Sequence, residues 1–259
     1  MAFDSTKSVA FIKSINLDAV PLYANVAIAQ KLEPDEVFDK AKAQSQLVGS
    51  TVFSFAQGVD TAVREAISDS ALLAQLVANS NAAQEEDPLK WFKLYSDVLM
   101  HLGWVLQEAQ FTDYTNKGNA VEVHEKILEV MTVALGPSAA ALAIVTATIN
   151  ALKGMKSDSS WLTIFNRESQ KARIARFQIG LVETGADSDV FVSLMCCLIE
   201  ANDTITQVLL FKFRSASASF KAQTQKVSIN RAALSDLGPS IRKKVRNYQD
   251  SYLSSILNV

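Results

Sequence analysis

Glycine, proline and cysteine are all scarce in this chain. Among 259 residues there are nine glycines, five prolines and two cysteines. So few chain-breaking residues argue against a glycine-rich barrel or a disordered protein, and they favour long regular elements. Hydrophobic residues make up 49% of the chain, which is enough to bury a sizeable core. We therefore expect one domain over residues 1–259.

Net charge and a secretion signal are also lacking. The formal net charge is -2, so no global basic field attracts nucleic acid, and a nucleic-acid partner is not expected. The first residues, "MAFDSTKSVAFIKS", lack a basic stretch followed by an unbroken apolar run, so no Sec signal peptide is predicted. Two cysteines fit a reducing compartment. A cytoplasmic location is predicted, with peripheral membrane contact left open.

No established catalytic motif occurs in the sequence. HExxH, GxSxG and phosphate-binding loops are absent, which removes the common nucleotide-dependent classes and leaves no catalytic or metal-binding residue to nominate. Glu122, Glu125 and Glu129 have the spacing of ordinary solvent-facing residues on a helix. The one prosthetic group considered is a covalent fatty acid, and a non-enzymatic function is favoured.

The helical part of the chain is expected over about 1–172. Apolar residues recur at near-helical intervals over 37–67, which predicts one long amphipathic helix bent at Gly49 and Gly58. Asp69 is expected to cap the helix that follows. A helix start is predicted at 33–36, and further helices are predicted over 17–32, 89–109, 120–135, 138–152 and 159–173.

The period changes after residue 173. Alternating or continuous apolar runs predict four consecutive antiparallel strands, at 175–183, 189–201, 204–214 and 218–230. The segment 189–201 is apolar at odd and even positions, so we expect helices or other cover on both of its faces. A C-terminal helix is predicted over about 231–257, with a break at Gly238-Pro239. The predicted fold class is α+β: mainly helical, with a late four-stranded antiparallel meander, at about 173–230, packed against helices.

Cys196 and Cys197 stand side by side in the apolar segment 189–201. Neighbouring residues on a strand point to opposite faces, so the two thiols cannot easily bond to each other or converge on one metal ion. Apolar surroundings raise a thiol pKa, which disfavours a nucleophile, and the two histidines, His101 and His124, lie amid apolar neighbours on predicted helices. Three interpretations stay open: two packed core residues, one S-acylated cysteine, or a thiol-dependent acyl-transfer enzyme.

Two other segments bear on membrane contact. Residues 130–152 carry no charge and are long enough to span a bilayer, but their glycine, proline and polar residues favour a packed core helix. The alternative is an insertable segment of a helical pore-forming toxin. Four basic residues of the C-terminal helix form either a solvated face or a contact for an anionic membrane surface. They are Arg242, Lys243, Lys244 and Arg246.

The stretch "SLMCCLIEA", late in a chain whose helices come first, resembles the layout of the Evf-type bacterial virulence factors associated with insect-gut colonisation. The resemblance implies an α/β protein with a fatty-acyl thioester on a cysteine and no established enzymatic activity. Its partner would be a fatty acid or membrane lipid, and no protein partner is indicated. Cys197 or Cys196 is then the lipidated residue. Cys197 is slightly favoured, because the small Ser193 shares its face and leaves room for a chain.

Overall fold

The structure is a computed structural model of the chain. It describes residues 4–20, 38–81, 87–106, 109–114, 120–136, 138–185, 189–213, 217–253 and 257–259. The helix predicted over 17–32 and the helix start predicted at 33–36 lie largely outside these residues.

Helices and strands are interleaved along the chain, and the fold is α+β, as the sequence predicts. The helices are α1 (Ser5–Ser14), α3 (Thr61–Asn81), α4 (Pro88–His101), α5 (Val123–Leu135), α6 (Ala139–Gly154), α7 (Ser160–Ser169), α8 (Arg231–Val245), η1 (Arg246–Tyr248) and α9 (Gln249–Tyr252). The strands are β1 (Gln44–Val48), β2 (Thr51–Phe55), β3 (Trp104–Val105), β4 (Thr112–Asp113), β5 (Val121–Glu122), β6 (Gln170–Lys171), β7 (Ile174–Thr184), β8 (Val190–Ala201), β9 (Lys212–Phe213), β10 (Ala218–Ile229) and β11 (Leu257–Asn258).

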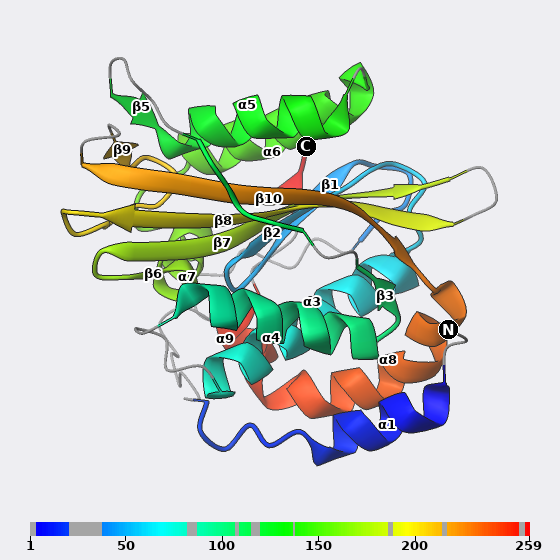
Figure 1. The fold of residues 1–259 in the computed structure, drawn as a ribbon. Helices are drawn as coiled ribbons and strands as arrows, with labels where there is room; N and C mark the ends of the chain where they lie inside the picture. The colour runs from blue at the N-terminus through cyan, green and yellow to red at the C-terminus, as the bar shows by residue number, and fades with distance from the viewer. Residues whose placement is uncertain are drawn as a thin grey trace.

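A mixed sheet runs through the middle of the molecule, with helices on both sides of it (Figure 1). Its strand order is β11-β1-β2-β7-β8-β10-β3, with β4 also on β10 and β6 also on β7. In Figure 1, α5 and α6 lie above the sheet, whereas α1, α3, α4 and α8 lie below it. Both faces of the central strands are therefore covered, as the apolar composition of 189–201 predicts.

The three long strands β7, β8 and β10 are antiparallel, as predicted, but β10 pairs directly with β8 and takes the place expected for the strand over 204–214. Their register places Cys197 between Phe177 on β7 and Ala222 on β10. Cys196 lies between Gln178 and Gln223 in the same way. The register thus fixes which side chains surround each thiol.

The predicted strand over 204–214 is wrong for most of its length. Bends and turns occupy 206–210, and within the described part of this segment only β9 pairs, with β5, in a separate two-stranded sheet. Ile205, Val208 and Leu209 are buried in the core shared with α5 and α7. The apolar composition therefore reflects burial within turns rather than strand pairing.

The long helix predicted over 37–67 is also wrong, because its centre is the β1–β2 hairpin. Gly49 has φ +55° between the two strands, a conformation that glycine adopts without steric cost. The polar residues that would form the solvent-exposed face of a helix are buried in the hairpin. Ser45 and Ser54, for example, hydrogen-bond to Thr148 of α6 at 2.6 and 2.8 Å between hydroxyl oxygens. The spacing of polar residues here follows interior hydrogen bonding.

Asp69 does not cap a helix. Helix α3 begins at Thr61, after the loop at Gly58 (φ +92°), and runs through this position. The buried Asp69 carboxylate instead accepts hydrogen bonds from Arg242 Nε and Gln249 Nε2, each at 3.1 Å. A cap and an internal ion pair use the same residue type, so the sequence alone does not separate them.

Helices α5 and α6 agree with their predicted ranges to within three residues, whereas α4, α7 and α8 differ. Helix α7 ends at Ser169, and the last predicted helical residues form β6 and the turn into β7. Helix α4 ends at His101 instead of continuing to 109, because Gly103 (φ +90°) turns the chain into β3. Helix α8 continues through Gly238-Pro239 without the predicted break. Its buried residues keep helical spacing on both sides of the proline: Ala233, Leu234, Leu237, Ile241 and Val245.

The C-terminal helix predicted over about 231–257 is wrong beyond α8, which ends at Val245. The chain passes through η1 and α9, and then β11 pairs antiparallel with β1. This last pairing closes the sheet edge next to β1, where an unpaired strand would expose backbone donors and acceptors.

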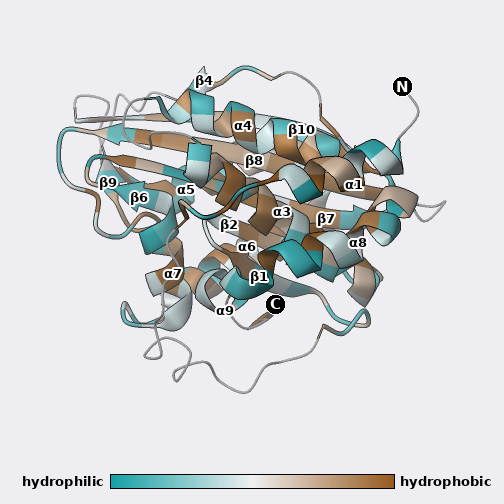
Figure 2. Cartoon of the chain, turned by 90° about the horizontal axis from the view of Figure 1, so that it is seen from below, coloured by the Kyte–Doolittle hydropathy of each residue, from teal (hydrophilic) through white to brown (hydrophobic). Residues whose placement is uncertain are grey.

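The sheet separates two hydrophobic cores. One core lies among α1, α3, α4 and α8, and it includes Cys196. The other lies among α5, α6 and α7, and it includes Cys197. Figure 2 shows hydrophobic residues along β7, β8 and α3, which lie between the outer helices. Adjacent residues of β8 therefore belong to different cores.

The close packing of β7 on β2 gives a test of the fold. A Cβ atom at Gly180 would lie 2.6 Å from the Phe53 ring, so we expect Gly180→Ala to destabilise the protein by about 1–3 kcal/mol through overpacking. The matched control is Gly238→Ala in α8, where a Cβ meets nothing within 4 Å and where alanine is the better helix former. Denaturant unfolding measures both changes. A Gly180→Ala variant as stable as Gly238→Ala would contradict the β2–β7 register.

Candidate functional site

The two cysteines lie in the middle of β8, at the centre of the sheet. Both are free thiols, and their exposed fractions are 1% for Cys196 and 0% for Cys197. Their side chains point to opposite faces, which excludes a bond between them in this fold. Burial of both agrees with the apolar segment in which they lie.

Cys197 has apolar surroundings. It belongs to the core of α5, α6 and α7, together with its cross-strand neighbours Phe177 and Ala222. Burial, and to a smaller extent the neighbouring Cys196, raises the pKa of the Cys197 thiol well above its usual value. A thiol in such an environment packs as a small hydrophobic group and does not act as a nucleophile.

Cys196 has polar neighbours on an otherwise apolar face. Gln178 and Gln223 flank it on the adjacent strands. Burial raises the pKa of the Cys196 thiol to about 12, and a hydrogen bond with the Gln223 side chain acts in the opposite direction. The thiol is therefore protonated near neutral pH. Sequence analysis did not single out either glutamine.

A buried hydrogen-bond network links Gln178 to β1, β2 and α3. Gln178 Oε1 accepts from Thr51 Oγ1 at 2.6 Å and from Ser50 Oγ at 3.2 Å. Gln75 of α3 donates to Thr51 Oγ1 at 3.0 Å and to the Val48 carbonyl oxygen at 2.9 Å. Each of these side chains has an exposed fraction of 2% or less. The network fixes the Gln178 side chain on the Cys196 face of the sheet.

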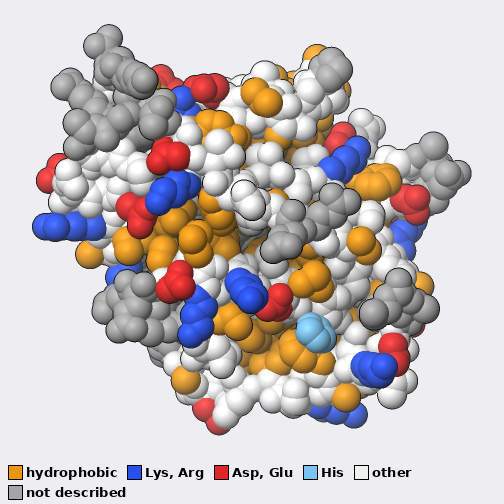
Figure 3. Space-filling model, in the orientation of Figure 1, with side chains coloured by type: hydrophobic (Ala, Val, Ile, Leu, Met, Phe, Trp, Pro, Cys, Tyr) orange, Lys and Arg blue, Asp and Glu red, His pale blue; other side chains and the backbone are white. Residues whose placement is uncertain are grey.

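A groove of about 690 Å³ lies between α4 and β10, on the same side of the sheet as Cys196. Figure 3 shows hydrophobic side chains gathered on this front face of the molecule. Leu89 and Met100 of α4 are half exposed along the groove, with exposed fractions of 50% and 46%. Gln223, which contacts the Cys196 thiol, also lines the groove. The groove therefore extends to the side chain next to Cys196.

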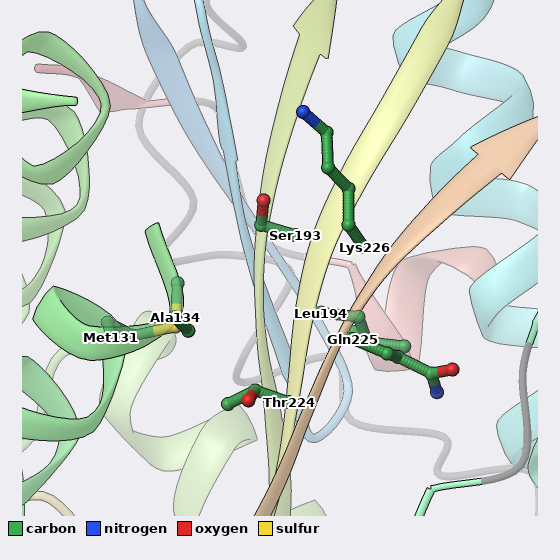
Figure 4. A pocket seen from close by; sticks show the side chains of 7 residues that line it. All are labelled: Met131, Ala134, Ser193, Leu194, Thr224, Gln225 and Lys226. Carbon is green, nitrogen blue, oxygen red and sulfur yellow. The ribbon is translucent and has the colours of Figure 1, made fainter. Parts of the chain in front are cut away.

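A second, smaller pocket of about 130 Å³ lies on the other side of the sheet. Figure 4 shows Met131 and Ala134 of α5 facing Ser193 and Thr224, while Leu194 and Gln225 lie on the opposite side of the strands. Ser193 thus has open space beside it. The pocket opens at this serine, and Cys197 is not among the residues that line it.

The two histidines make hydrogen bonds away from the cysteines. His101 Nδ1 lies 2.8 Å from the Asp97 carbonyl oxygen. His124 Nδ1 lies 3.3 Å from the Leu209 carbonyl oxygen, and His124 Nε2 lies 3.0 Å from Lys153 Nζ. Within the described part of the chain, no cluster of histidine, cysteine and acidic residues could hold a metal ion.

The carboxylates singled out in the sequence have local roles in α5. Glu122 and Glu125 form a capping box at the start of the helix. Glu129 pairs with Lys126, with 2.6 Å between Nζ and Oε2. Glu122 also lies 3.2 Å from Lys212 Nζ. These interactions stabilise the helix start and the β5–β9 pair.

The four basic residues of the C-terminal segment differ in their surroundings. Arg242 pairs with Glu65 at 2.8 Å and with Asp69 at 3.1 Å, and Lys244 approaches the Lys13 carbonyl oxygen at 3.5 Å. The other two, Lys243 and Arg246, are exposed. The apolar stripe of the same segment is buried against the core of α1, α3, α4 and α8. Contact of these basic residues with a membrane stays a prediction.

The uncharged segment 130–152 is divided between two helices. It contains the last turns of α5, a turn at Gly136 (φ +62°) and most of α6. Val145, Ile149 and Leu152 of α6 are fully buried. No helix within the described ranges is long and apolar enough to cross a membrane.

Comparison with known proteins gives two remote structural likenesses. No protein-family model matches the chain, and no curated protein matches it. A solved structure described as a delta-endotoxin is similar with a TM-score of 0.43 and 14% identity, over 76% of this chain and 84% of that chain. The structure of the Evf virulence factor is similar with a TM-score of 0.32 and 11% identity, over 96% of this chain and 91% of that chain.

The likeness to the Evf virulence factor, predicted from the sequence, is thus found in the structure as well. Both TM-scores lie below 0.5, and neither likeness is a basis for assigning an activity.

Thiol labelling tests the two environments. In the single-cysteine variants Cys197→Ala and Cys196→Ala, both native thiols should react slowly with a small alkylating reagent, because both are buried and protonated. Adding Gln223→Ala should accelerate labelling of Cys196, because the groove then reaches the thiol, and should leave Cys197 unchanged. Mass spectrometry over time measures both rates. Equal acceleration at the two cysteines would contradict the placement of Gln223 between groove and thiol.

Proposed function

We propose that this chain is a non-enzymatic, lipid-associating protein that carries a long-chain fatty acid as a thioester on Cys196, with the acyl chain in the groove between α4 and β10. The observation that carries the proposal is the position of Gln223, which contacts the Cys196 thiol and lines the groove. The proposal includes the virulence-associated role that the sequence resemblance implies.

The groove has suitable size and lining for an acyl chain. Its volume of about 690 Å³ falls within the range of about 300–1,000 Å³ that is typical of small-molecule sites. Apolar side chains from α4 and from the segment before β4 line it, including Leu89, Phe92, Met100, Leu106 and Phe111. Each methylene group removed from water contributes about 0.8 kcal/mol, so a long chain held here is strongly retained.

The position of the groove favours Cys196 over Cys197. Cys197 faces a closed core, and the pocket near Ser193 has only about 130 Å³. From the sequence, Cys197 is slightly favoured because the small Ser193 leaves room for an acyl chain on its face, and the structure does have open space beside Ser193. That space is about one fifth of the groove volume, and the groove lies on the Cys196 face.

Attachment requires an acyl donor and an opening at Gln223. The Cys196 sulfur forms a new bond to the acyl carbon of an acyl-thioester donor, the donor's carbon–sulfur bond breaks, and the Cys196 proton leaves with the donor thiol. Because the pKa of the buried thiol is about 12, the transfer takes place while Cys196 is transiently exposed or before the sheet has closed.

An acyl chain in the groove connects lipidation with membrane contact. Housed in the groove, the chain adds to the hydrophobic core, and the protein stays in solution. Released from the groove, a single chain gives marginal and reversible membrane binding, which a basic patch strengthens. Lys243 and Arg246 are exposed and could supply that second contact.

Intact-mass spectrometry tests the lipidation. Protein from its native host should be heavier than the bare sequence by one long-chain acyl group, and neutral hydroxylamine should remove this mass because it cleaves thioesters. Cys196→Ala should abolish the added mass, and the matched control Cys197→Ala should retain it. A bare mass for the wild-type protein would refute the proposal. Loss of the acyl group only in Cys197→Ala would refute the choice of cysteine.

Fatty-acid binding tests the groove separately from the thioester. In a Cys196→Ala background the groove is free of covalent lipid, so it should bind a fluorescent long-chain fatty acid. Met100→Lys places a charge among the apolar side chains of the groove and should weaken binding by roughly tenfold or more. The control Val133→Lys changes a residue of α5 that is 81% exposed and outside the groove. Equal effects of the two substitutions would contradict binding in the groove.

A further inference from the structure

Two buried hydrogen-bond donors near Cys196 lack partners. Gln178 Nε2 and the Tyr95 hydroxyl are both fully buried, and neither makes a hydrogen bond within the part of the chain that the structure describes. Leaving a buried polar group unpaired costs about 1–3 kcal/mol. Native proteins rarely leave such groups unpaired, so two in one place indicate a missing acceptor.

Both donors belong to the surroundings of the Cys196 thiol. Gln178 is the direct cross-strand neighbour of Cys196. Burial raises the pKa of the Tyr95 phenol far above its usual value, Cys196 lies close enough to raise it further, and the nearby Thr51 side chain acts in the opposite direction. The Thr51 hydroxyl proton is already donated to Gln178 Oε1, so the Tyr95 hydroxyl lies beside Thr51 without a hydrogen bond of normal geometry. Tyr95 projects from α4, the helix that also forms one wall of the groove. The two donors thus approach the thiol from a strand and from a helix.

The direction of the Gln178 amide follows from its network. Gln75 Oε1 accepts from the Ser50 backbone N–H at 2.9 Å, and Gln75 Nε2 donates to the Val48 carbonyl oxygen at 2.9 Å. Gln75 Nε2 therefore donates to Thr51 Oγ1, which leaves the Thr51 proton for Gln178 Oε1. Oε1 is thus held by Ser50 and Thr51 on the β2 side, and Nε2 is the end of the amide left without a partner.

We propose that Gln178 Nε2 and the Tyr95 hydroxyl donate hydrogen bonds to the carbonyl oxygen of the acyl group on Cys196. This inference rests on the proposed acylation of that residue. A thioester carbonyl has one oxygen with two lone pairs, so it can accept from both donors. The thiol itself cannot satisfy them, because sulfur is a weak acceptor.

The two donors, Gln178 Nε2 and the Tyr95 hydroxyl, together form a cradle for the carbonyl oxygen, and this cradle determines where the acyl chain goes. With the carbonyl oxygen fixed between Gln178 and Tyr95, the alkyl chain leaves the carbonyl carbon in another direction. Gln223 flanks Cys196 on the strand opposite Gln178, and the groove begins there. The two donors are therefore positioning residues that direct the chain toward the groove.

Stability of the acylated and deacylated proteins tests the cradle. In the acylated protein, Tyr95→Phe should lower the denaturant midpoint of unfolding, because it removes a hydrogen bond. After hydroxylamine treatment the same substitution should leave the midpoint unchanged or raise it, since the hydroxyl then has no partner. The matched control is Tyr248→Phe: the Tyr248 hydroxyl donates to the Leu17 carbonyl oxygen at 2.9 Å, so its loss should lower both midpoints equally.

Infrared spectroscopy gives a second, direct readout. Protein labelled with ¹³C at the acyl carbonyl should show a stretching frequency lowered by hydrogen bonding. Tyr95→Phe and Gln178→Met should each raise this frequency, and Tyr248→Phe should leave it unchanged.

Three outcomes would overturn the inference in distinguishable ways. Equal midpoint shifts from Tyr95→Phe in both forms would assign Tyr95 a merely structural role. An unchanged carbonyl frequency in both variants that keep the acyl mass would show that buried water, rather than the acyl group, pairs with the two donors. Absence of an acyl group from the wild-type protein would refute the proposed acylation itself, and the cradle with it.

Discussion

Burial of β8 on both faces is the constraint on which the rest of the structure depends. A strand that is apolar at odd and even positions needs a hydrophobic layer on each side. Helices α3 and α4 supply one layer, and α5, α6 and α7 supply the other. Because side chains alternate along a strand, the same constraint assigns Cys196 and Cys197 to different cores. The two cysteines are therefore adjacent in sequence but have different neighbours, and they cannot act together at one site.

The Cys196 face differs from the other face because it contains polar side chains that the core does not fully satisfy. Most of them pair with one another, as in the network of Ser50, Thr51, Gln75 and Gln178. A cluster of this kind destabilises an apolar core unless it is completed. Placing a carbonyl group at Cys196 and its alkyl chain in the groove would complete the cluster and fill the space with one ligand.

The sequence predicted those elements in which local pattern and tertiary role agree. The uninterrupted apolar run of β8 predicted its two-sided cover, and the helical period predicted α5, α6 and α7. The β1–β2 hairpin was missed because its buried serines, threonine and glutamines find partners far away in the chain, as Ser45 does in Thr148. Gln178 and Gln223 were missed for the same reason, and Tyr95 was missed because its apolar ring fits the core face of α4, which gives no sign of a role for the hydroxyl. A glutamine within a buried strand was the one local signal that could have identified this site.

A crystal structure of the protein purified from its native host, without reagents that cleave thioesters, tests the proposed acylation most directly. The account predicts continuous electron density from Cys196 Sγ, past Gln223, into the groove between α4 and β10, with the carbonyl oxygen within hydrogen-bonding distance of Gln178 Nε2. A groove that holds only water beside an unmodified Cys196, or an acyl chain attached to Cys197, would contradict it.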